Sequence, residues 1–323
     1  MKRMLGLRSA ALLALVLIAP TRPSGGDDVA KGNPDTFRVV GYLPEYRASG
    51  FDPAAAADLD ELVYFSVEVE PTGKLDLARL KPEALRALRA AKARHGVALT
   101  LCVGGWNRSA GFAPMAASPG ARRRFVGELA RFCVDNGFDG VDLDWEHPKT
   151  PAEAEDHASL LAAAREAFGP RRLALTIAVA GWQDLSPRAI GAVDAVNLMA
   201  YDADGRHSTF DFARADVDRV ARRGVPLRKI RLGVPFYGRG VADRSIERSY
   251  AEIVAKDHPA PEVDEVGGVY FNGPRTIERK TRYALDAKLG GIMIWEVGQD
   301  TRDDRSLLKA IRRTTGPKAR LSP

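Results

Sequence analysis

The chain carries, at residues 139–146, the stretch Asp-Gly-Val-Asp-Leu-Asp-Trp-Glu, in which three carboxylates recur at two-residue intervals within an apolar run. Because successive side chains of a β-strand point to opposite faces, we expect Asp142, Asp144 and Glu146 on one face, about 6–7 Å apart along the strand. Like charges at this spacing resist ionising together, so the arrangement does not favour folding. It suits chemistry that needs one protonated and one ionised carboxyl group.

This acidic strand belongs to a repeating pattern of short apolar runs and amphipathic helical stretches. The expected strands cover residues 37–43, 62–69, 97–103, 140–145, 173–180, 194–200, 230–236 and 291–296. The clearest expected helices cover residues 82–94, 120–136, 152–168, 212–223, 275–288 and 303–313. Continuous apolar strands are typical of a parallel sheet covered by helices. The pattern predicts an α/β fold, a single (β/α)₈ TIM barrel; a doubly wound sheet is the alternative, but no glycine-rich dinucleotide loop follows the first strand.

A barrel of this kind places catalytic groups at the carboxyl ends of its strands and in the loops that follow. Several chemically useful residues hold such positions after the third, fourth, sixth and eighth strands: Gly104, Gly105, Trp106, Glu146, Tyr201, Asp202 and Trp295. We therefore expect them to converge on one mouth of the barrel.

The first residues have the composition of an export signal. A basic leader precedes an unbroken apolar run at residues 10–19, which is too short to span a membrane and fits a signal peptide. We expect residues 1–24 to be the signal peptide, 25–36 a linker, 37–316 the catalytic barrel and 317–323 a tail. A signal anchor is the alternative. The mature protein is then expected to be secreted or periplasmic, without a membrane partner, and monomeric.

Charge and cysteine content give weaker constraints. The signal peptide holds four basic residues and no acidic one, so its removal lowers the formal charge from +6 to +2 and no nucleic-acid partner is expected. The two cysteines, Cys102 and Cys133, fall on an expected strand and an expected helix. In an oxidising compartment they can pair, but free buried thiols are the preferred interpretation.

In the residues expected at the mouth of the barrel, the chain resembles glycoside hydrolase family 18, the family of chitinase-like barrels. Residues 139–146 match the family's DGxDxDxE signature at every fixed position. Other segments are similar to its remaining strand motifs: residues 41–42, 101–106, 199–202, 233–238 and 291–296. The resemblance extends over about residues 37–313 in the family's order.

The resemblance implies hydrolysis of β-1,4 bonds next to N-acetylglucosamine, with retention of configuration, in which the substrate's own acetamido oxygen is the nucleophile. Glu146 is then the general acid, and Asp144 orients the acetamido N–H. Asp142 lies behind Asp144 and shares a proton or hydrogen bond with it, while Tyr201 donates to the acetamido oxygen. The expected substrate is chitin or chito-oligosaccharides.

The remaining site residues divide into two groups. The expected substrate-binding residues are Trp295, Asp202, Met199, Tyr42, Trp106, Phe236 and Tyr237. The expected supporting residues are Asp139, Gly104, Gly105 and Cys102. Cys102 stands where the family usually has serine, which weakens a supporting hydrogen bond to the acidic cluster. Between the seventh and eighth strands only about residues 239–274 are available, too few for the α+β insertion domain of many family members.

Several alternatives remain at this point. The same chemistry fits a peptidoglycan strand or the chitobiose core of an N-glycan, and a weakly catalytic, lectin-like chitin-binding barrel would keep the fold. A site for Mg²⁺ or Ca²⁺ is a rival interpretation of the three carboxylates, but their spacing is not that of a calcium loop. We expect no metal and no cofactor.

Overall fold

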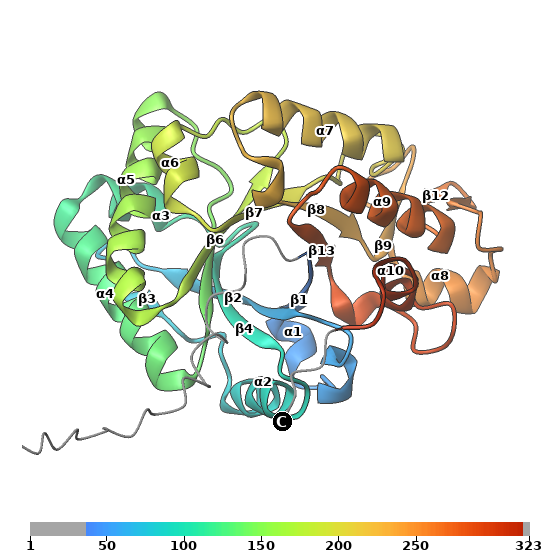
Figure 1. The fold of residues 1–323 in the computed structure, drawn as a ribbon, viewed down its shortest axis with the longest axis horizontal. Helices are drawn as coiled ribbons and strands as arrows, with labels where there is room; N and C mark the ends of the chain where they lie inside the picture. The colour runs from blue at the N-terminus through green and yellow to red at the C-terminus, as the bar shows by residue number, and fades with distance from the viewer. Residues whose placement is uncertain (1–36, 319–323) are drawn as a thin grey trace, which may run out of the picture.

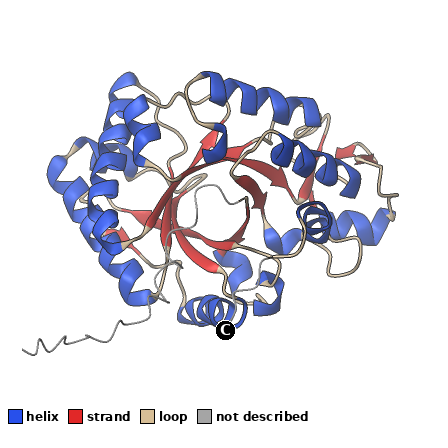
Figure 2. Ribbon diagram, in the orientation of Figure 1, coloured by secondary structure: helices blue, strands red, loops and turns tan. Residues whose placement is uncertain are grey.

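A computed structural model describes residues 37–318 and has a closed barrel of parallel strands at its centre (Figure 1). The predicted signal peptide and linker, residues 1–36, lie outside the described residues, as does most of the predicted tail. Figure 2 shows the strands as an inner ring and the helices around it.

The barrel strands follow one another around the ring in chain order, and β1 pairs with both β2 and β13, which closes it. Their bounds are Arg38–Pro44 (β1), Glu61–Val69 (β2), Ala98–Gly104 (β4), Gly140–Asp144 (β5), Ala174–Ala180 (β6), Ala195–Met199 (β7), Ile230–Pro235 (β8) and Gly291–Trp295 (β13). The short β3 (Leu75–Asp76) adds to β2 in antiparallel register. The single barrel predicted from the sequence is confirmed, with every expected strand in place.

The helices cover the outside of the barrel. Their bounds are Glu45–Ala48 (α1), Pro82–His95 (α2), Phe112–Ala117 (α3), Pro119–Asn136 (α4), Pro151–Phe168 (α5), Pro187–Ala192 (α6), Phe210–Arg222 (α7), Tyr250–Asp257 (α8), Pro274–Asp286 (α9) and Leu307–Thr315 (α10). The hydroxyls of Ser118 and Thr150 accept from the first-turn N–H groups of α4 and α5, and proline follows each cap. The last helix begins four residues later than expected, because Ser306 caps it and Asp300 accepts from the N–H groups of Leu307 and Leu308.

Strand alternation produces two separate apolar layers. In β1, Val39 and Leu43 pack outward against the helices, whereas Val40 and Tyr42 point into the barrel with Met293. The same alternation in β5 sends the apolar residues outward and the carboxylates inward. The barrel interior is therefore where the acidic side chains meet.

The segment between β8 and β13 is more than a loop. It forms β9 (Tyr237–Gly240), β10 (Glu247–Ser249), β11 (Glu265–Val266) and β12 (Val269–Tyr270), an antiparallel sheet in the order β10-β9-β12-β11, together with α8. In Figure 1 this small unit projects from the right side of the barrel, outside β8. We refer to residues 237–270 as the β9–β12 unit.

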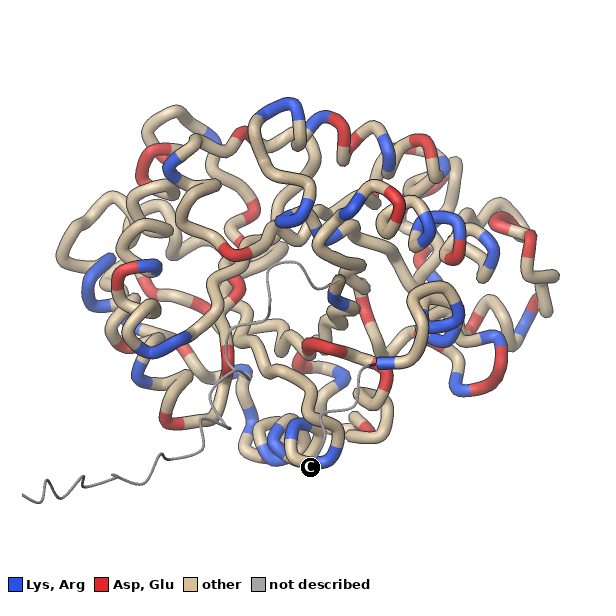
Figure 3. The backbone as a smooth tube through the Cα atoms, viewed as in Figure 1, with Lys and Arg blue, Asp and Glu red and all other residues tan. Residues whose placement is uncertain are grey.

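Charged residues are spread over the surface, and both cysteines lie in the interior. Figure 3 shows basic and acidic residues interspersed around the outer helices. Within residues 37–318, no helix is long and apolar enough to cross a membrane. Cys102 and Cys133 are free and buried, as preferred above.

Gly104 is the last residue of β4 and lies where β4 packs closely against β5. A substitution at this position therefore tests that packing. Its φ is +97°, and a Cβ added there would lie 2.3 Å from the carbonyl oxygen of Asp144. We expect Gly104→Ala to lower the free energy of unfolding by about 2–5 kcal/mol, from backbone strain and overpacking together. The measurement is urea denaturation followed by circular dichroism.

The matched control is Gly127→Ala in α4, where an added Cβ would have no heavy atom within 4 Å. There alanine should raise the free energy of unfolding by about 0.5–1 kcal/mol, because glycine disfavours a helix interior. Equal stabilities for the two variants would contradict the close approach of β4 and β5.

Candidate active site

The strand β5 directs its acidic residues as the alternation predicts. Asp142 and Asp144 are buried inside the barrel, and Glu146 follows immediately after the strand. Trp145 points the other way and stacks on Phe112, with ring centroids 5.4 Å apart. Trp145 is therefore a core residue.

A cavity of about 610 Å³ lies at the carboxyl ends of the strands. Eight of the residues expected at the site line it: Tyr42, Trp106, Asp144, Glu146, Met199, Tyr201, Asp202 and Trp295. Trp182, for which lining the cleft and capping the barrel were equal alternatives, also lines it, as do Tyr46, Phe65, His147, Ala178, Ala180, Arg239, Arg244, Glu247 and Met293. Segments far apart in the chain thus converge on one mouth.

Asp142 is held at the back of the site by several donors. The Tyr42 hydroxyl donates to Oδ2 at 2.8 Å, and Thr176 Oγ1 and Asn197 Nδ2 donate to Oδ1 at 2.5 and 2.9 Å. The thiol of Cys102 lies 3.6 Å from Oδ2. Burial raises the pKa of Asp142, and these hydrogen bonds oppose the rise.

This geometry corrects one expectation. No hydrogen bond joins Asp142 to Asp144 in the described residues, because both oxygens of Asp142 are engaged by the donors behind it. Cys102 does stand next to the acidic cluster as expected, at the longer distance that a thiol imposes.

Asp144 presents an unused acceptor. Its Oδ1 is buried and has no hydrogen-bond partner among the described residues. Burial raises the pKa of Asp144 well above its ordinary value, and the charges of Glu146 and Asp142 raise it further. A buried carboxyl oxygen without a partner is costly unless a ligand supplies a donor.

Glu146 has the properties of a general acid. Burial, followed by the charge of Asp202, raises its pKa to about 7, while a hydrogen bond from the backbone N–H of Trp106 lowers it. His147 Nε2 lies 3.6 Å from Oε2, and Nδ1 of that ring contacts Gln183 Oε1 at 3.1 Å. A carboxyl group that keeps its proton up to neutral pH can protonate a leaving group.

Aromatic and sulfur-containing side chains form the floor beside these acids. Trp295 contacts Phe65 edge-on at 4.6 Å and Tyr42 at 5.8 Å between ring centroids. The hydroxyl of Tyr201 lies 3.8 Å from Met293 Sδ, and burial raises the pKa of Tyr201 well above its usual value. The floor therefore combines flat apolar faces with one neutral phenol donor.

Two residues expected to extend this aromatic platform do not reach the cavity. Phe236 is fully buried in the layer between barrel and helices, because alternation at the end of β8 turns it outward. Tyr237 is buried behind Asp202 and donates its hydroxyl to Asp202 Oδ1 at 2.6 Å. Tyr237 thus positions an acid rather than forming a binding face.

Asp139 also lies away from the acidic cluster, at the opposite end of β5. Its carboxylate accepts from Lys92 Nζ at 2.6 and 2.7 Å and from the N–H of Leu99 at 2.9 Å. It anchors α2 to the bottom of the barrel. Gly104 and Gly105, by contrast, lie directly against β5 and Phe65, where no Cβ fits.

Sequence reasoning missed residues that support the acids. Thr176 and Asn197 were detectable, because each has the inward parity of its strand: Asn197 precedes Met199 and Tyr201 by two and four positions. Ser109 had no such signal. It lies in the loop after β4 and contacts both Asp144 and Glu146 through the backbone.

The β9–β12 unit supplies one wall of the cavity. Arg239 pairs with Asp202 at 3.2 Å and with Glu247 at 3.0 Å. Arg244 donates to the carbonyl oxygen of Asp202 at 2.7 Å. The short insertion therefore still shapes the site, although it is smaller than a full insertion domain.

The donor set does not indicate a metal site. Among residues 37–318, no group of three or more histidine, cysteine or acidic side chains is arranged to hold a metal ion. Three of the four donors to Asp142 are hydroxyl or amide groups, which leave its oxygens occupied.

Comparisons with known proteins agree with this geometry. Residues 38–300 match the profile described as Glycosyl hydrolases family 18. Chitinase 1 of Aphanocladium album is 28% identical over 283 residues, covering 70% of this chain and 67% of that protein. The chain spans about two thirds of the length of such curated relatives.

Two solved structures share the fold. The GH18 chitinase ChiB of Flavobacterium johnsoniae aligns with a TM-score of 0.77 at 27% identity, covering 86% of this chain and 94% of that one. A plant class V chitinase mutant from Cycas revoluta, in complex with (GlcNAc)3, aligns with a TM-score of 0.75 at 25% identity, covering 86% of this chain and all of the other.

The electrostatics of the site can be tested without a substrate. Asp202→Asn removes the anion that helps to keep Glu146 protonated, and it removes one of the two carboxylates that pair with Arg239. Both effects favour the ionised form, so the pKa of Glu146 should fall below about 7. The measurement is ¹³C NMR titration of glutamate-labelled protein, with the signal assigned from Glu146→Gln.

Asp211→Asn, on the exposed first turn of α7, is the control and should leave that titration unchanged. A rise in the pKa of Glu146 on removal of Asp202 would contradict the described charge balance.

Proposed function

The chain belongs to the glycosyl hydrolases of family 18, and from this membership we propose that it cleaves β-1,4 bonds next to N-acetylglucosamine in chitin or chito-oligosaccharides. It is a glycoside hydrolase of the chitinase-like type.

One observation carries the proposal: Asp144, whose buried Oδ1 has no hydrogen-bond partner among the described residues, lines the same cavity as Glu146 and Tyr201. A sugar that carries an acetamido group offers an N–H for Asp144 and a carbonyl oxygen for the Tyr201 hydroxyl. Trp295 offers a flat apolar face for the pyranose ring. A plain glucose residue would leave the Asp144 oxygen without a donor, which is costly in a buried site.

The first step breaks the glycosidic bond. The carboxyl group of Glu146 gives its proton to the glycosidic oxygen, and the leaving sugar departs as an alcohol. The acetamido oxygen of the substrate attacks the anomeric carbon and forms a cyclic oxazolinium ion. Asp144 accepts the acetamido N–H and stabilises the positive charge that develops there.

The second step restores the enzyme. The Glu146 carboxylate accepts a proton from a water molecule, whose oxygen attacks the anomeric carbon and opens the oxazolinium ring. The product keeps its original configuration and Glu146 is again protonated. Because the acid regains the proton it gave, the cycle needs no other acid or base.

The raised pKa of Glu146 supports this role. Burial and a neighbouring anion keep the carboxyl protonated up to a pH of about 7, so the acid is present at neutral pH and is lost as the pH rises further. The carboxyl groups of Asp144 and Glu146 resist ionising together. When Asp144 is the anion, the proton therefore stays on Glu146.

The chemistry of relatives supports the substrate class. The Cycas revoluta structure holds (GlcNAc)3, and the Aphanocladium album relative is a chitinase. We also propose that the protein is exported. The basic leader and the apolar run at residues 10–19 support this, and both lie outside the described residues.

Removal of the transferable proton tests the mechanism. Glu146→Gln keeps the shape of the side chain, so binding of a chito-oligosaccharide should persist while kcat falls by roughly 10²–10⁴-fold, the usual contribution of a general acid. The measurements are turnover of (GlcNAc)4 and calorimetric titration with the same ligand.

Glu247→Gln is the matched control, because Glu247 lies on the rim of the cavity and pairs with Arg239. It should retain most of the turnover. Hydrolysis by Glu146→Gln at the wild-type rate would remove Glu146 from the mechanism.

The substrate itself supplies the nucleophile, so its acetyl group is a second test. An oligomer of glucosamine that lacks N-acetyl groups should not be cleaved, since its amine cannot form an oxazolinium ring. Mass spectrometry of the products after prolonged incubation gives the answer. Efficient cleavage of that oligomer, or of a plain β-1,4-glucan, would contradict substrate-assisted catalysis.

A further inference from the structure

The loop after β4, residues 105–109, contacts Glu146 at two points. The backbone N–H of Trp106 donates to the Glu146 carboxylate. The hydroxyl of Ser109 accepts from the backbone N–H of Glu146 at 3.0 Å. The same hydroxyl oxygen lies 3.1 Å from the carbonyl oxygens of Asp144 and Gly105, toward which it donates. Ser109 thus links both Asp144 and Glu146 to the loop.

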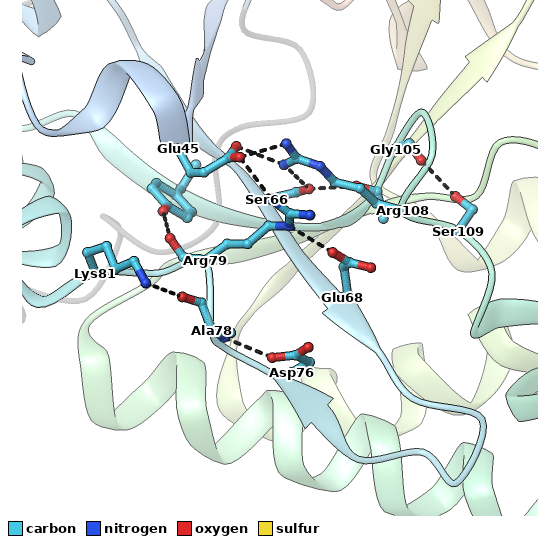
Figure 4. A network of polar contacts seen from close by, with 12 residues as sticks. Glu45, Ser66, Glu68, Asp76, Ala78, Arg79, Lys81, Gly105, Arg108 and Ser109 are labelled. Atoms are coloured by element: carbon cyan, nitrogen blue, oxygen red, sulfur yellow. Dashed lines mark hydrogen bonds and ion pairs between the residues drawn. The ribbon is translucent and has the colours of Figure 1, made fainter.

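Arg108, the neighbour of this serine, fastens the loop to α1 and to β2 (Figure 4). Its guanidinium donates to both carboxylate oxygens of Glu45 in α1, at 2.7 and 2.8 Å, and to Ser66 Oγ in β2 at 3.2 Å. It also lies 5.0 Å from the ring centroid of Phe65. Ser66 in turn donates to the carbonyl oxygen of Gly104 at 2.6 Å.

The ion pair between Arg108 and Glu45 is shielded from solvent, which favours a single geometry. The side chains of Arg108 and Glu45 are only 12% and 15% exposed, so their paired hydrogen bonds are shielded from water. An ion pair of this kind holds one geometry because the planar guanidinium matches the carboxylate. Loop residues 105–109 are therefore held in two ways. Arg108 fixes the loop to Glu45 and Ser66, and Ser109 fixes it to the backbone of Asp144 and Glu146.

We propose that Ser109 and Arg108 are positioning residues for the general acid: they hold the 105–109 loop so that the Glu146 carboxyl keeps one orientation toward the cavity. The inference rests on the proposed role of Glu146. Neither side chain lines the cavity, so both act through the loop.

The orientation has an electrostatic consequence. A hydrogen bond from the Trp106 N–H stabilises the carboxylate of Glu146, so its loss raises the pKa of that group. Other titratable groups also face Glu146 from the neighbouring elements: Asp142 and Asp144 on β5, His147 after it, Cys102 on β4, and Tyr201 and Asp202 after β7. Ser109→Ala removes no charge, so a shift in its titration reports the loop; for Arg108, which is itself charged, the loss of an equally charged Arg79 beside the same Glu45 provides the comparison.

The first test compares Ser109→Ala with Ser109→Thr. Alanine removes the hydroxyl, so the Glu146 titration should move above about 7 and kcat for (GlcNAc)4 should fall about 10–100-fold, with the alkaline limb of the pH profile moving upward. KM should change little, because no sugar contact is lost. Threonine keeps a hydroxyl and should restore both the titration and most of kcat.

The second test uses Arg108→Met against Arg79→Ala. Methionine keeps an unbranched apolar side chain without the guanidinium, and the same shift of the Glu146 titration is expected. Arg79 is the matched control, since it contacts the same Glu45 at 3.3 Å and Glu68 at 2.7 Å but no residue of the loop (Figure 4). Arg79→Ala should leave both the titration and kcat unchanged.

The ¹³C NMR titration of Glu146 needs no substrate, which separates this inference from the proposed function. A shifted titration in a protein that does not cleave (GlcNAc)4 would overturn the proposed substrate and still support the positioning role. An unshifted titration with unchanged kcat in Ser109→Ala overturns the positioning role. A loss of kcat that Ser109→Thr shares, with no titration shift, indicates a packing defect and overturns it as well.

Discussion

The active site depends on one constraint: three carboxyl groups are held close together, away from bulk water, at the end of one strand. Asp142 and Asp144 are almost completely buried, and Glu146 follows them at the cavity wall. Burial is the largest influence on all three and raises the pKa of each. A barrel accepts this arrangement because its strands enclose the acids and the surrounding helices supply the stability of the fold.

The three carboxyl groups differ in the hydrogen bonds that the protein gives them. Asp142 is surrounded by hydroxyl, amide and thiol donors, so its hydrogen bonding is complete without a ligand. Asp144 keeps an oxygen without a partner, and Glu146 receives a backbone N–H from a loop. The carboxyl group deepest in the barrel is thus fully hydrogen-bonded by the protein, whereas the two that line the cavity keep capacity for a ligand.

Two loop segments complete the site that the strand ends form. The β9–β12 unit brings Arg239 and Arg244 against the backbone and side chain of Asp202, and the loop after β4 brings Ser109 against β5. Each loop is secured outside the cavity, through the Glu45–Arg108 ion pair on one side and the antiparallel β9–β12 sheet on the other. Contacts from these two loops therefore surround the acids at the mouth of the barrel.

The sequence by itself determined the barrel, the order of its strands and the inward acids, because alternation along a strand is a local property of the backbone. The same rule applied to β6 and β7 would have identified Thr176 and Asn197. It would also have argued against Phe236 as a substrate-binding residue, because Phe236 faces outward at the end of β8, and the expectation for Tyr237 was wrong because this residue lies behind Asp202. Only the tertiary structure decided that Asp142 bonds to Tyr42, Thr176 and Asn197 and that Ser109 and Arg108 contact the groups beside Glu146 and the loop. Those contacts join residues 34 to 100 positions apart, and their geometry follows from how separate loops pack at the mouth of the barrel.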